Sequence, residues 1–278
     1  MARGIFLRVL TIRIATGMRT WIAQRRDNRI LSALARYCAK YLRAWENQLQ
    51  WDVVTNGEAF ALRAVTRVVA GDLFDVGANV GGWAVMAAAA APDRRIHSFE
   101  LAPRTYARLA ERVAGMPQVV INPFGLGDVE EQVVFHYYVD SDDRSSLVLM
   151  PDGFTKTEET GSIRTGDSYV TSAGVERIAY LKIDVEGAEM RVLRGFERSL
   201  ESGIIAAVQF EHGPAHVYTR TVLLEFVEFF ESRGYVVYRL FPRKLLPLRY
   251  DPAEENFVGS NFVAIRAEIA REVLAAKH

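Results

Sequence analysis

The sequence has few of the residues that build a disulfide framework or a structural metal site. Among 278 residues it contains one cysteine, Cys38, and five scattered histidines. A single cysteine excludes an internal disulfide and is compatible with a reducing cytoplasm. The cysteine and histidines do not follow the spacing of a structural zinc site, so we predict no metal ligands.

The chain also lacks a long uninterrupted apolar segment. Residues 5–22 are rich in aliphatic and aromatic residues, but Arg8, Arg13 and Arg19 interrupt them. No span of about twenty apolar residues remains, so a transmembrane helix is not predicted. No small-residue cleavage site follows, so we do not interpret the segment as a secretory signal. We expect a cytoplasmic protein, with membrane association left open.

Net charge is absent too, because 34 basic residues balance 34 acidic ones. Residues 1–50 nevertheless carry ten arginines and lysines against two acids, Asp27 and Glu46, so the remainder is acidic. An acidic core without a basic stripe is not typical of nucleic-acid binding. We predict that residues 1–55 form a basic helical extension. It would act as a helical cap or dimerisation arm, or as a peripheral contact with an anionic membrane. Within it, residues 29–51 have the periodicity of a helix.

The most informative segment is a strand, a glycine-rich turn and a helix in succession. Residues 73–82 read Leu-Phe-Asp-Val-Gly-Ala-Asn-Val-Gly-Gly. The turn contains Gly77, Asn79 and Gly81. Because glycine has no Cβ, the backbone N–H groups of such a turn can approach a ligand closely. A second strand ends in Glu100, which can accept hydrogen bonds from both hydroxyls of a ribose. The combination predicts a bound nucleoside cofactor.

The acid in this turn distinguishes between cofactors. Dinucleotide folds usually show G-x-G-x-x-G, whereas here Asp75 ends the strand and Asn79 takes the middle position. Asp75 would repel a diphosphate but would favour the sulfonium and ammonium groups of S-adenosylmethionine (SAM). The turn therefore favours SAM, and a dehydrogenase is the more distant alternative.

From residue 56 onward the pattern alternates strands with helices. This predicts an α/β domain over residues 56–278 with a doubly wound, mostly parallel sheet. Two late strands without a helix between them predict an antiparallel edge. A strand pair is expected near 133–139 and a polar loop or lid at 140–166. The predicted strands are residues 73–76, 95–99, 119–122, 178–183, 204–210, 236–240 and 261–266. The predicted helices are residues 56–70, 82–91, 104–114, 188–202 and 222–233. Seven such strands resemble the class I SAM-methyltransferase core.

A second constellation lies at residues 180–195, where an apolar strand delivers Asp184 and Glu186 to the carboxyl edge of the sheet. Asp184, Glu186 and Glu189 lie within six residues. Burying three acids together is costly unless a sulfonium, Lys182, a metal or a shared proton offsets their charge. The next strand ends in Glu211 and His212, and a histidine there could act as a general base. Our candidates for the base are Asp184 and then His212. Glu186 and Glu211 are candidate orienting groups.

With both constellations identified, residues 56–266 resemble the FkbM-type SAM-dependent methyltransferases. The resemblance is carried by Asn56-Gly57-Glu58, the turn at 74–81, Ser98-Phe99-Glu100, Gly125-Leu126-Gly127-Asp128, Ser145-Ser146-Leu147 and the segment 181–195. It implies that Glu100 holds the ribose and Asp128 the adenine region. It also implies that Gly77, Asn79 and Gly81 line the methionine end, with Asp75 close by. Leu101 and Asp184 complete the candidate cofactor-binding residues.

The resemblance implies O-methylation of a hydroxyl on a sugar, glycolipid or natural product. Methylation of nitrogen or of a protein stays open, as does a SAM-binding scaffold without turnover. The expected partners are SAM and a small-molecule or glycan acceptor, and no nucleic acid. A homo-oligomer is also left open. The first fifty-odd residues fall outside the resemblance, so it implies nothing about their role.

Overall fold

The computed structural model describes residues 16–139, 145–151 and 153–276. The chain divides into two compact units, one ending at Glu46 and one beginning at Asn47. In the first unit residues 16–23 are helical and α2 spans Arg29–Trp45, so this helix ends before residue 51. In the described part of the chain, no helix is long and apolar enough to cross a bilayer. Most of the segment 5–22 lies outside the described residues.

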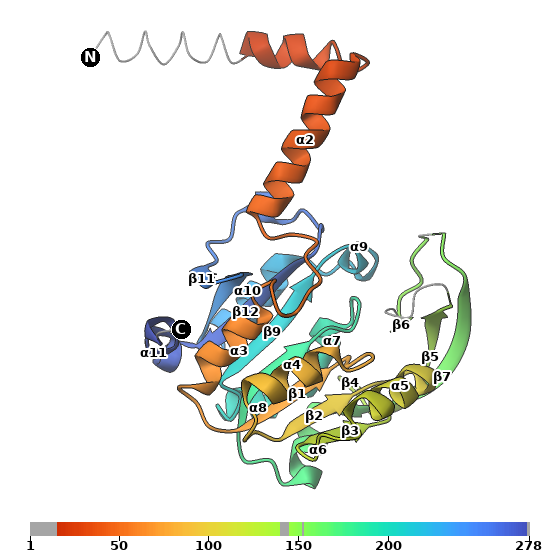
Figure 1. Cartoon of the computed structure of the whole chain (residues 1–278), viewed down its shortest axis with the longest axis vertical. Helices are drawn as coiled ribbons and strands as arrows, with labels where there is room; N and C mark the ends of the chain where they lie inside the picture. Colours follow the sequence, from red (N-terminus) through yellow and green to blue (C-terminus); the bar gives the residue numbers. More distant parts are fainter. Residues whose placement is uncertain (1–15, 140–144, 152, 277–278) are drawn as a thin grey trace. The chain divides into compact units, whose positions relative to one another are not determined.

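The second unit is built on one large mixed sheet with the α/β order that the alternating sequence predicts (Figure 1). Five neighbouring strands, β3, β2, β1, β8 and β9, are parallel, and β12 runs antiparallel between β9 and β10. In spatial order the strands are β11 (Lys244–Pro247), β10 (Tyr235–Phe241), β12 (Ser260–Arg266), β9 (Ala207–His212), β8 (Ile178–Ile183), β1 (Asp72–Val76), β2 (Ile96–Phe99) and β3 (Val119–Asn122).

The sheet has eight strands rather than the predicted seven. The additional strand, β11, forms a tight hairpin with β10, in which Phe241 pairs with Lys244. Its four residues include only one buried side chain, Leu245. So short a segment has too little alternation to be recognised from its sequence, and pairing with its neighbour creates it.

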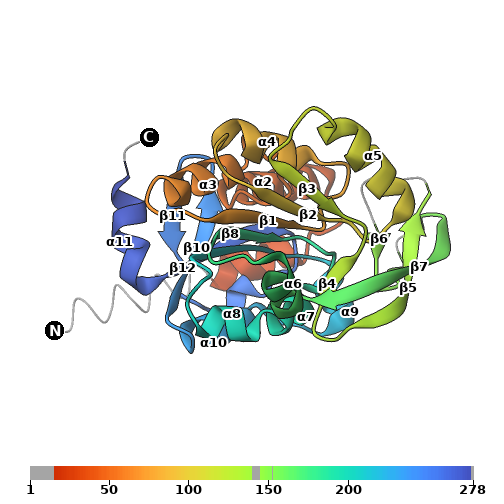
Figure 2. The ribbon, with the colours of Figure 1, turned by 90° about the horizontal axis from the view of Figure 1, so that it is seen from below.

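Helices cover both faces of this sheet, as Figure 2 shows. The two faces carry separate apolar cores, one rich in alanine beneath the first group of helices and one rich in phenylalanine beneath the second. The first group is α3 (Glu58–Thr66), α4 (Gly82–Ala90), α5 (Pro103–Val113) and α11 (Ala267–Ala275). The second is α6 (Gly166–Ala173), α7 (Glu189–Gly195), α8 (Glu197–Glu201) and α10 (Leu223–Glu231). The doubly wound prediction is therefore confirmed.

Two predicted elements differ from the structure. The helix expected over residues 188–202 is split into α7 and α8 at Phe196, whose backbone leaves the helical region and whose side chain is buried beside Phe74. Just before the split, a Cβ on Gly195 would overlap the carbonyl oxygen of Gly127. Close packing of the backbone therefore determines where the helix is interrupted. Sequence periodicity gives no information on such packing.

The expected polar loop at 140–166 contains a ten-residue strand. β7 (Lys156–Thr165) pairs along its length with β5 (Glu131–Tyr138), and β4 (Gly125–Gly127) and β6 (Ser145–Ser146) complete a small four-stranded sheet. The small sheet lies on the β3 side of the main sheet in both views (Figures 1 and 2). β7 has few apolar residues, so backbone pairing rather than apolar burial defines it. Residues 140–144 and 152 of the expected loop lie outside the described residues.

Candidate active site

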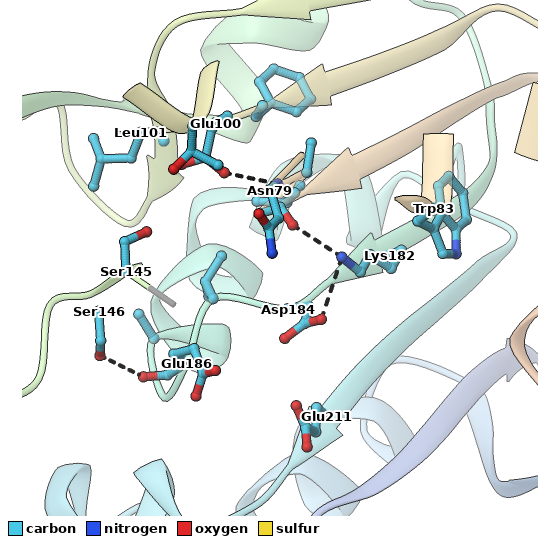
Figure 3. Close-up of a pocket in the computed structure, with 18 of the residues that line it drawn as sticks. Asn79, Trp83, Glu100, Leu101, Ser145, Ser146, Lys182, Asp184, Glu186 and Glu211 are labelled. Atoms are coloured by element: carbon cyan, nitrogen blue, oxygen red, sulfur yellow. Dashed lines mark hydrogen bonds and ion pairs between the residues drawn. The ribbon is translucent and has the colours of Figure 1, made fainter. Parts of the chain in front are cut away.

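A cavity of about 560 Å³ lies at the carboxyl ends of the central strands (Figure 3). Its wall combines the ends of β1, β2, β8 and β9 with the β1–α4 turn and with β6. Its volume is that of a small-molecule site, and this edge of a doubly wound sheet is where such sites form. The predicted residues that line it are Gly77, Asn79, Glu100, Leu101, Asp184, Glu186 and Glu211.

The β1–α4 turn forms one wall through backbone that only certain residues can adopt. Gly77 and Asn79 have φ of 77° and 50°, in the left-handed region that glycine and asparagine tolerate best. A Cβ on Gly77 would overlap the carbonyl oxygen of Asp184 on the neighbouring strand end. The turn therefore brings the carboxyl ends of β1 and β8 into direct contact.

Glu100 ends β2 and is 4% exposed, yet it lines the cavity. One carboxylate oxygen accepts the N–H of Asn79 and the other accepts the N–H of Ala102, each at 2.8 Å. Burial raises the pKa of Glu100, although these two N–H groups oppose the shift. Each oxygen can accept a second hydrogen bond, so the carboxylate is positioned to receive donors from the cavity.

Lys182 supplies a buried positive charge beneath the cavity. Its Nζ lies 3.2 Å from Asp75 Oδ1, 3.5 Å from Asp184 Oδ2 and 3.1 Å from the carbonyl oxygen of Gly77. Burial opposes the charge on Lys182, but Asp75, Asp184 and Glu58 outweigh burial and raise its pKa. Asp75 is fully buried behind the wall and does not line the cavity. It therefore acts on the site through Lys182.

The opposite side of the cavity from Glu100 is acidic, with Asp184, Glu186 and Glu211 facing one another across the ends of β8 and β9 (Figure 3). Glu186 has a left-handed φ of 52°. Burial, together with the negative charges of Asp184 and Glu186, raises the pKa of Glu211 well above its usual value. Asp184 is 43% exposed, and Lys182, which contacts it, also contacts Asp75.

Glu58, at the start of α3, is a cavity residue that we did not include among the candidates. It is buried, and its carboxylate accepts hydrogen bonds from Asn56 at 2.6 Å and from Gln209 at 2.7 Å. Gln209 in turn accepts the hydroxyl hydrogen bond of Tyr180 at 2.9 Å. The Asn56-Gly57-Glu58 segment of the family resemblance was the available signal. The position of Glu58 in the cavity depends on its contact with Gln209 of β9, which is 151 residues away in the sequence.

Buried hydrogen bonds of Glu189 stabilise the loop that carries Asp184 and Glu186. One carboxylate oxygen of Glu189 accepts the N–H groups of Val185 and Gly187, at 3.0 and 3.3 Å. The other lies 2.9 Å from Nε2 of His216, and both side chains are almost fully buried. Gly213 N–H donates to Nδ1 of His216, so the imidazole proton on Nε2 faces Glu189. Ser146 adds a hydrogen bond from its hydroxyl to the carbonyl oxygen of Glu186.

His212 is not brought to the cavity. β9 continues to His212, so Glu211 and His212 point to opposite faces of the sheet. His212 packs against Phe226 and Phe257, and its Nε2 lies 3.3 Å from the carbonyl oxygen of Thr221. Burial and the nearby His216 lower the pKa of His212 to about 4.

Two further candidate residues lie outside the cavity wall. Gly81 has φ of 82° and ends the turn as the N-cap of α4, packed against Leu109. Asp128 pairs with Arg191 at 2.7 Å, and this partner outweighs partial burial to lower the pKa of Asp128. Among the residues that the structure describes, no three His, Cys, Asp or Glu side chains are grouped to hold a metal ion.

Parts of this sequence match a protein family and two known proteins. Residues 75–237 match the family described as the methyltransferase FkbM domain. The hexuronic acid methyltransferase AglP of Haloferax volcanii is 31% identical, over 51% of this chain and 56% of that protein. The AMB antimetabolite synthetase AmbE of Pseudomonas aeruginosa is 30% identical, over 45% of this chain and 8% of that protein. The chain thus spans about half the length of the first relative and a small part of the second.

The solved structures to which this chain is similar share less of its sequence. The methyltransferase FkbM of Methylobacillus flagellatus KT has 15% identity and a TM-score of 0.46, over 70% of this chain and 43% of that one. Fibrillarin of Aeropyrum pernix, solved with bound SAM, has 15% identity and a TM-score of 0.39, over 70% of this chain and 66% of that one.

Proposed function

This chain belongs to the FkbM methyltransferase family, and from that premise we propose that it transfers a methyl group from SAM to a hydroxyl oxygen of a sugar-containing acceptor. The observation that carries the proposal is that the two ends of the cavity differ in their chemistry. Glu100 and the left-handed turn lie at one end, and the carboxyl groups of Asp184, Glu186 and Glu211 lie at the other.

The first end fits the nucleoside of SAM. Glu100 is buried but keeps free acceptor capacity toward the cavity, as a partner of the ribose hydroxyls must. Leu101 adds an apolar surface, and Gly77 and Asn79 present backbone close to the ligand. When bound, SAM supplies an electrophilic methyl group. The acidic wall suits its positive charges.

The second end suits an acceptor hydroxyl that must lose a proton. A carboxylate with a raised pKa is a stronger base, so Glu211 replaces Asp184 as our first candidate for general base. Asp184 lies 3.5 Å from Lys182 Nζ, so its carboxylate is already engaged by a cation. Asp184 and Glu186 then orient the acceptor hydroxyls. Alignment of the acceptor oxygen in such a site contributes a large part of the rate.

Two observations support a sugar as the acceptor. AglP, named as a hexuronic acid methyltransferase, is similar to this chain over half its length. Trp51 lines the cavity and is 59% exposed, so its ring face is available to stack on a sugar ring. Because Glu58, Asp184, Glu186 and Glu211 would repel a carboxylate placed beside them, we assign the methyl group to a hydroxyl of the sugar rather than to a carboxyl group.

The same negative wall favours one alternative, methyl transfer to an amine. A protonated amine would be attracted to this wall, and it would also need a base to release its lone pair. The two products are distinguished by their chemistry, because the proton and carbon resonances of O-methyl and N-methyl groups differ.

The test of the proposed function measures cofactor binding and methyl transfer separately. Calorimetric titration with SAM should give saturable binding, and Glu100→Gln should weaken the binding at least tenfold, since about 1.4 kcal/mol or more of hydrogen bonding is lost. Asp72→Asn is the matched control, because Asp72 lies at the opposite end of β1 and pairs with His97. Wild-type affinity in Glu100→Gln would refute the cofactor assignment.

Methyl transfer is then followed from methyl-labelled SAM into fractionated glycans, glycolipids, small molecules and protein. Label in O-methyl groups of a sugar fraction supports the proposal. Label in N-methyl groups supports the amine alternative. SAM binding without any labelled fraction, in extracts that contain the native acceptor, would instead favour a scaffold without turnover.

A further inference from the structure

The helix α2 has two faces of different chemistry. Apolar and aromatic residues recur every three or four positions, so they share one face of a helix with 3.6 residues per turn. None of the residues of α2 is buried. The apolar face consists of Ile30, Leu34, Tyr37, Tyr41 and Trp45, and Leu31, Cys38 and Leu42 flank it. The residues of the apolar face, together with Leu42, are 55–79% exposed.

The opposite face of α2 is basic. Arg29, Arg36, Lys40 and Arg43 follow the same periodicity on that side, and the helix contains no acidic residue. The helix is also well formed at its start, where the side chain of Asn28 accepts the N–H groups of Ile30 and Leu31. An amphipathic sequence with this separation of faces is typical of helices that lie in the plane of a membrane surface.

We propose that α2 docks on an anionic phospholipid surface, with the apolar face inserted among the headgroups and the basic residues facing lipid phosphates. Charge complementarity favours this occupant over a second copy of the chain. A second copy packed on the apolar face would leave the four basic residues without counter-charges, whereas an anionic bilayer supplies counter-charges. The tyrosine and tryptophan rings suit the boundary between headgroups and acyl chains.

The helical residues 16–23 extend the same chemistry. Met18, Trp21 and Ile22 are 45–59% exposed, and Arg19, Arg25 and Arg26 lie among or directly after them. This second short segment gives the surface two adjacent anchors, and binding by two weak anchors is stronger than binding by either alone.

The test is co-sedimentation of the full chain with phosphatidylcholine vesicles with and without phosphatidylglycerol. Binding should require the anionic lipid and should fall as salt is raised. Arg36→Gln with Lys40→Gln should weaken the partition coefficient roughly thirtyfold, from the usual contribution of each basic residue near an anionic surface. Leu34→Ser with Tyr41→Ser should weaken it by a similar factor, because both residues lie on the apolar face.

Ala33→Ser with Ala39→Ser is the matched control, because it introduces two serines into α2 outside the apolar face. It should bind as the wild type does, and circular dichroism should show equal helix content in all variants. Cys38 is the only cysteine and is exposed, so a polarity-sensitive fluorophore attached there reports insertion directly. Its emission should shift to the blue with anionic vesicles.

Three outcomes would overturn the proposal. One is equal binding to neutral and anionic vesicles, and another is equal binding by the control and the Leu34–Tyr41 variant. The third is self-association in sedimentation equilibrium that the Leu34–Tyr41 variant abolishes while vesicles bind neither protein. That result would assign the face to a second copy.

Discussion

Among single residues, Lys182 supplies the positive charge that offsets the buried acids of the site. It is the one cation among the described residues of the cavity wall, and its Nζ contacts a fully buried carboxylate, Asp75, and a partly exposed one, Asp184. An ion pair of this depth gives little net stability over an apolar pair, but its disruption leaves an uncompensated buried charge.

We predict that Lys182→Met lowers the free energy of unfolding by about 3–5 kcal/mol, because Asp75 loses its counter-charge. The measurement is urea unfolding, compared with Asp75→Asn and with the double variant. The double variant should be more stable than Lys182→Met alone, since no buried charge is left unpaired. Additive losses in the double variant would show that the two side chains do not act as a pair.

We predict that Glu211→Gln reduces turnover about 10²–10⁴-fold, the usual contribution of a general base, without changing SAM affinity. His212→Asn should leave turnover near the wild type, because His212 lies on the opposite face of β9. Turnover by the wild type should fall as pH decreases through the raised pKa of Glu211, above the ordinary value of 4.5. Asp184→Asn should move this loss to lower pH, because a neighbouring negative charge is removed. An unmoved acid limb would argue against Glu211.

The side chains of the site could be predicted from the sequence only where a strand end determined them. Glu100 and Asp184 follow buried strands, so their place at the sheet edge was predictable. The choice between Glu211 and His212 depends on which face of β9 each one occupies, and we ended that strand two residues early. Glu58 reaches the cavity only because α3 packs on the sheet, which local sequence does not show.

At the scale of elements, the β1–α4 turn and the β8–α7 loop form one unit through Gly77. We predict that Gly77→Ala destabilises the protein and abolishes measurable SAM binding, because the methyl group overlaps the Asp184 carbonyl and φ is left-handed. Gly82→Ala is the control, since a Cβ at Gly82 meets nothing within 4 Å. Thermal melts and SAM titration of both variants check the prediction, and equal behaviour would contradict it.

The elements themselves were largely predictable, because buried parallel strands such as Ile178–Ile183 are long apolar runs. Their ends are correct to within one residue for β1, β2, β3 and β8. Prediction failed where pairing partners rather than apolar residues define the strand. β7 is polar and is held by β5, and β11 is four residues long. The sequence has no local signal for either.

At the scale of the whole molecule, the chain separates a basic unit ending at Glu46 from a larger unit that contains all described residues of the cavity wall. We predict that a chain beginning at Asn47 folds and binds SAM with wild-type affinity, since no residue named in the site lies before it. Circular dichroism and SAM titration check this. A loss of SAM binding in the folded shortened chain would show that the first unit contributes to the site.

The small sheet has a consequence for how this enzyme family could diversify. At the proposed cofactor end of the cavity Glu100 follows β2 of the main sheet, whereas at the proposed acceptor end Ser146 of β6 in the small sheet donates a hydrogen bond to the carbonyl oxygen of Glu186. Substitutions and length changes in the hairpin that bears β6 can therefore reshape the acceptor end while Glu100 and its turn stay unchanged. A chimera that exchanges this hairpin between two relatives would inherit the acceptor preference of the donor and the cofactor affinity of the recipient.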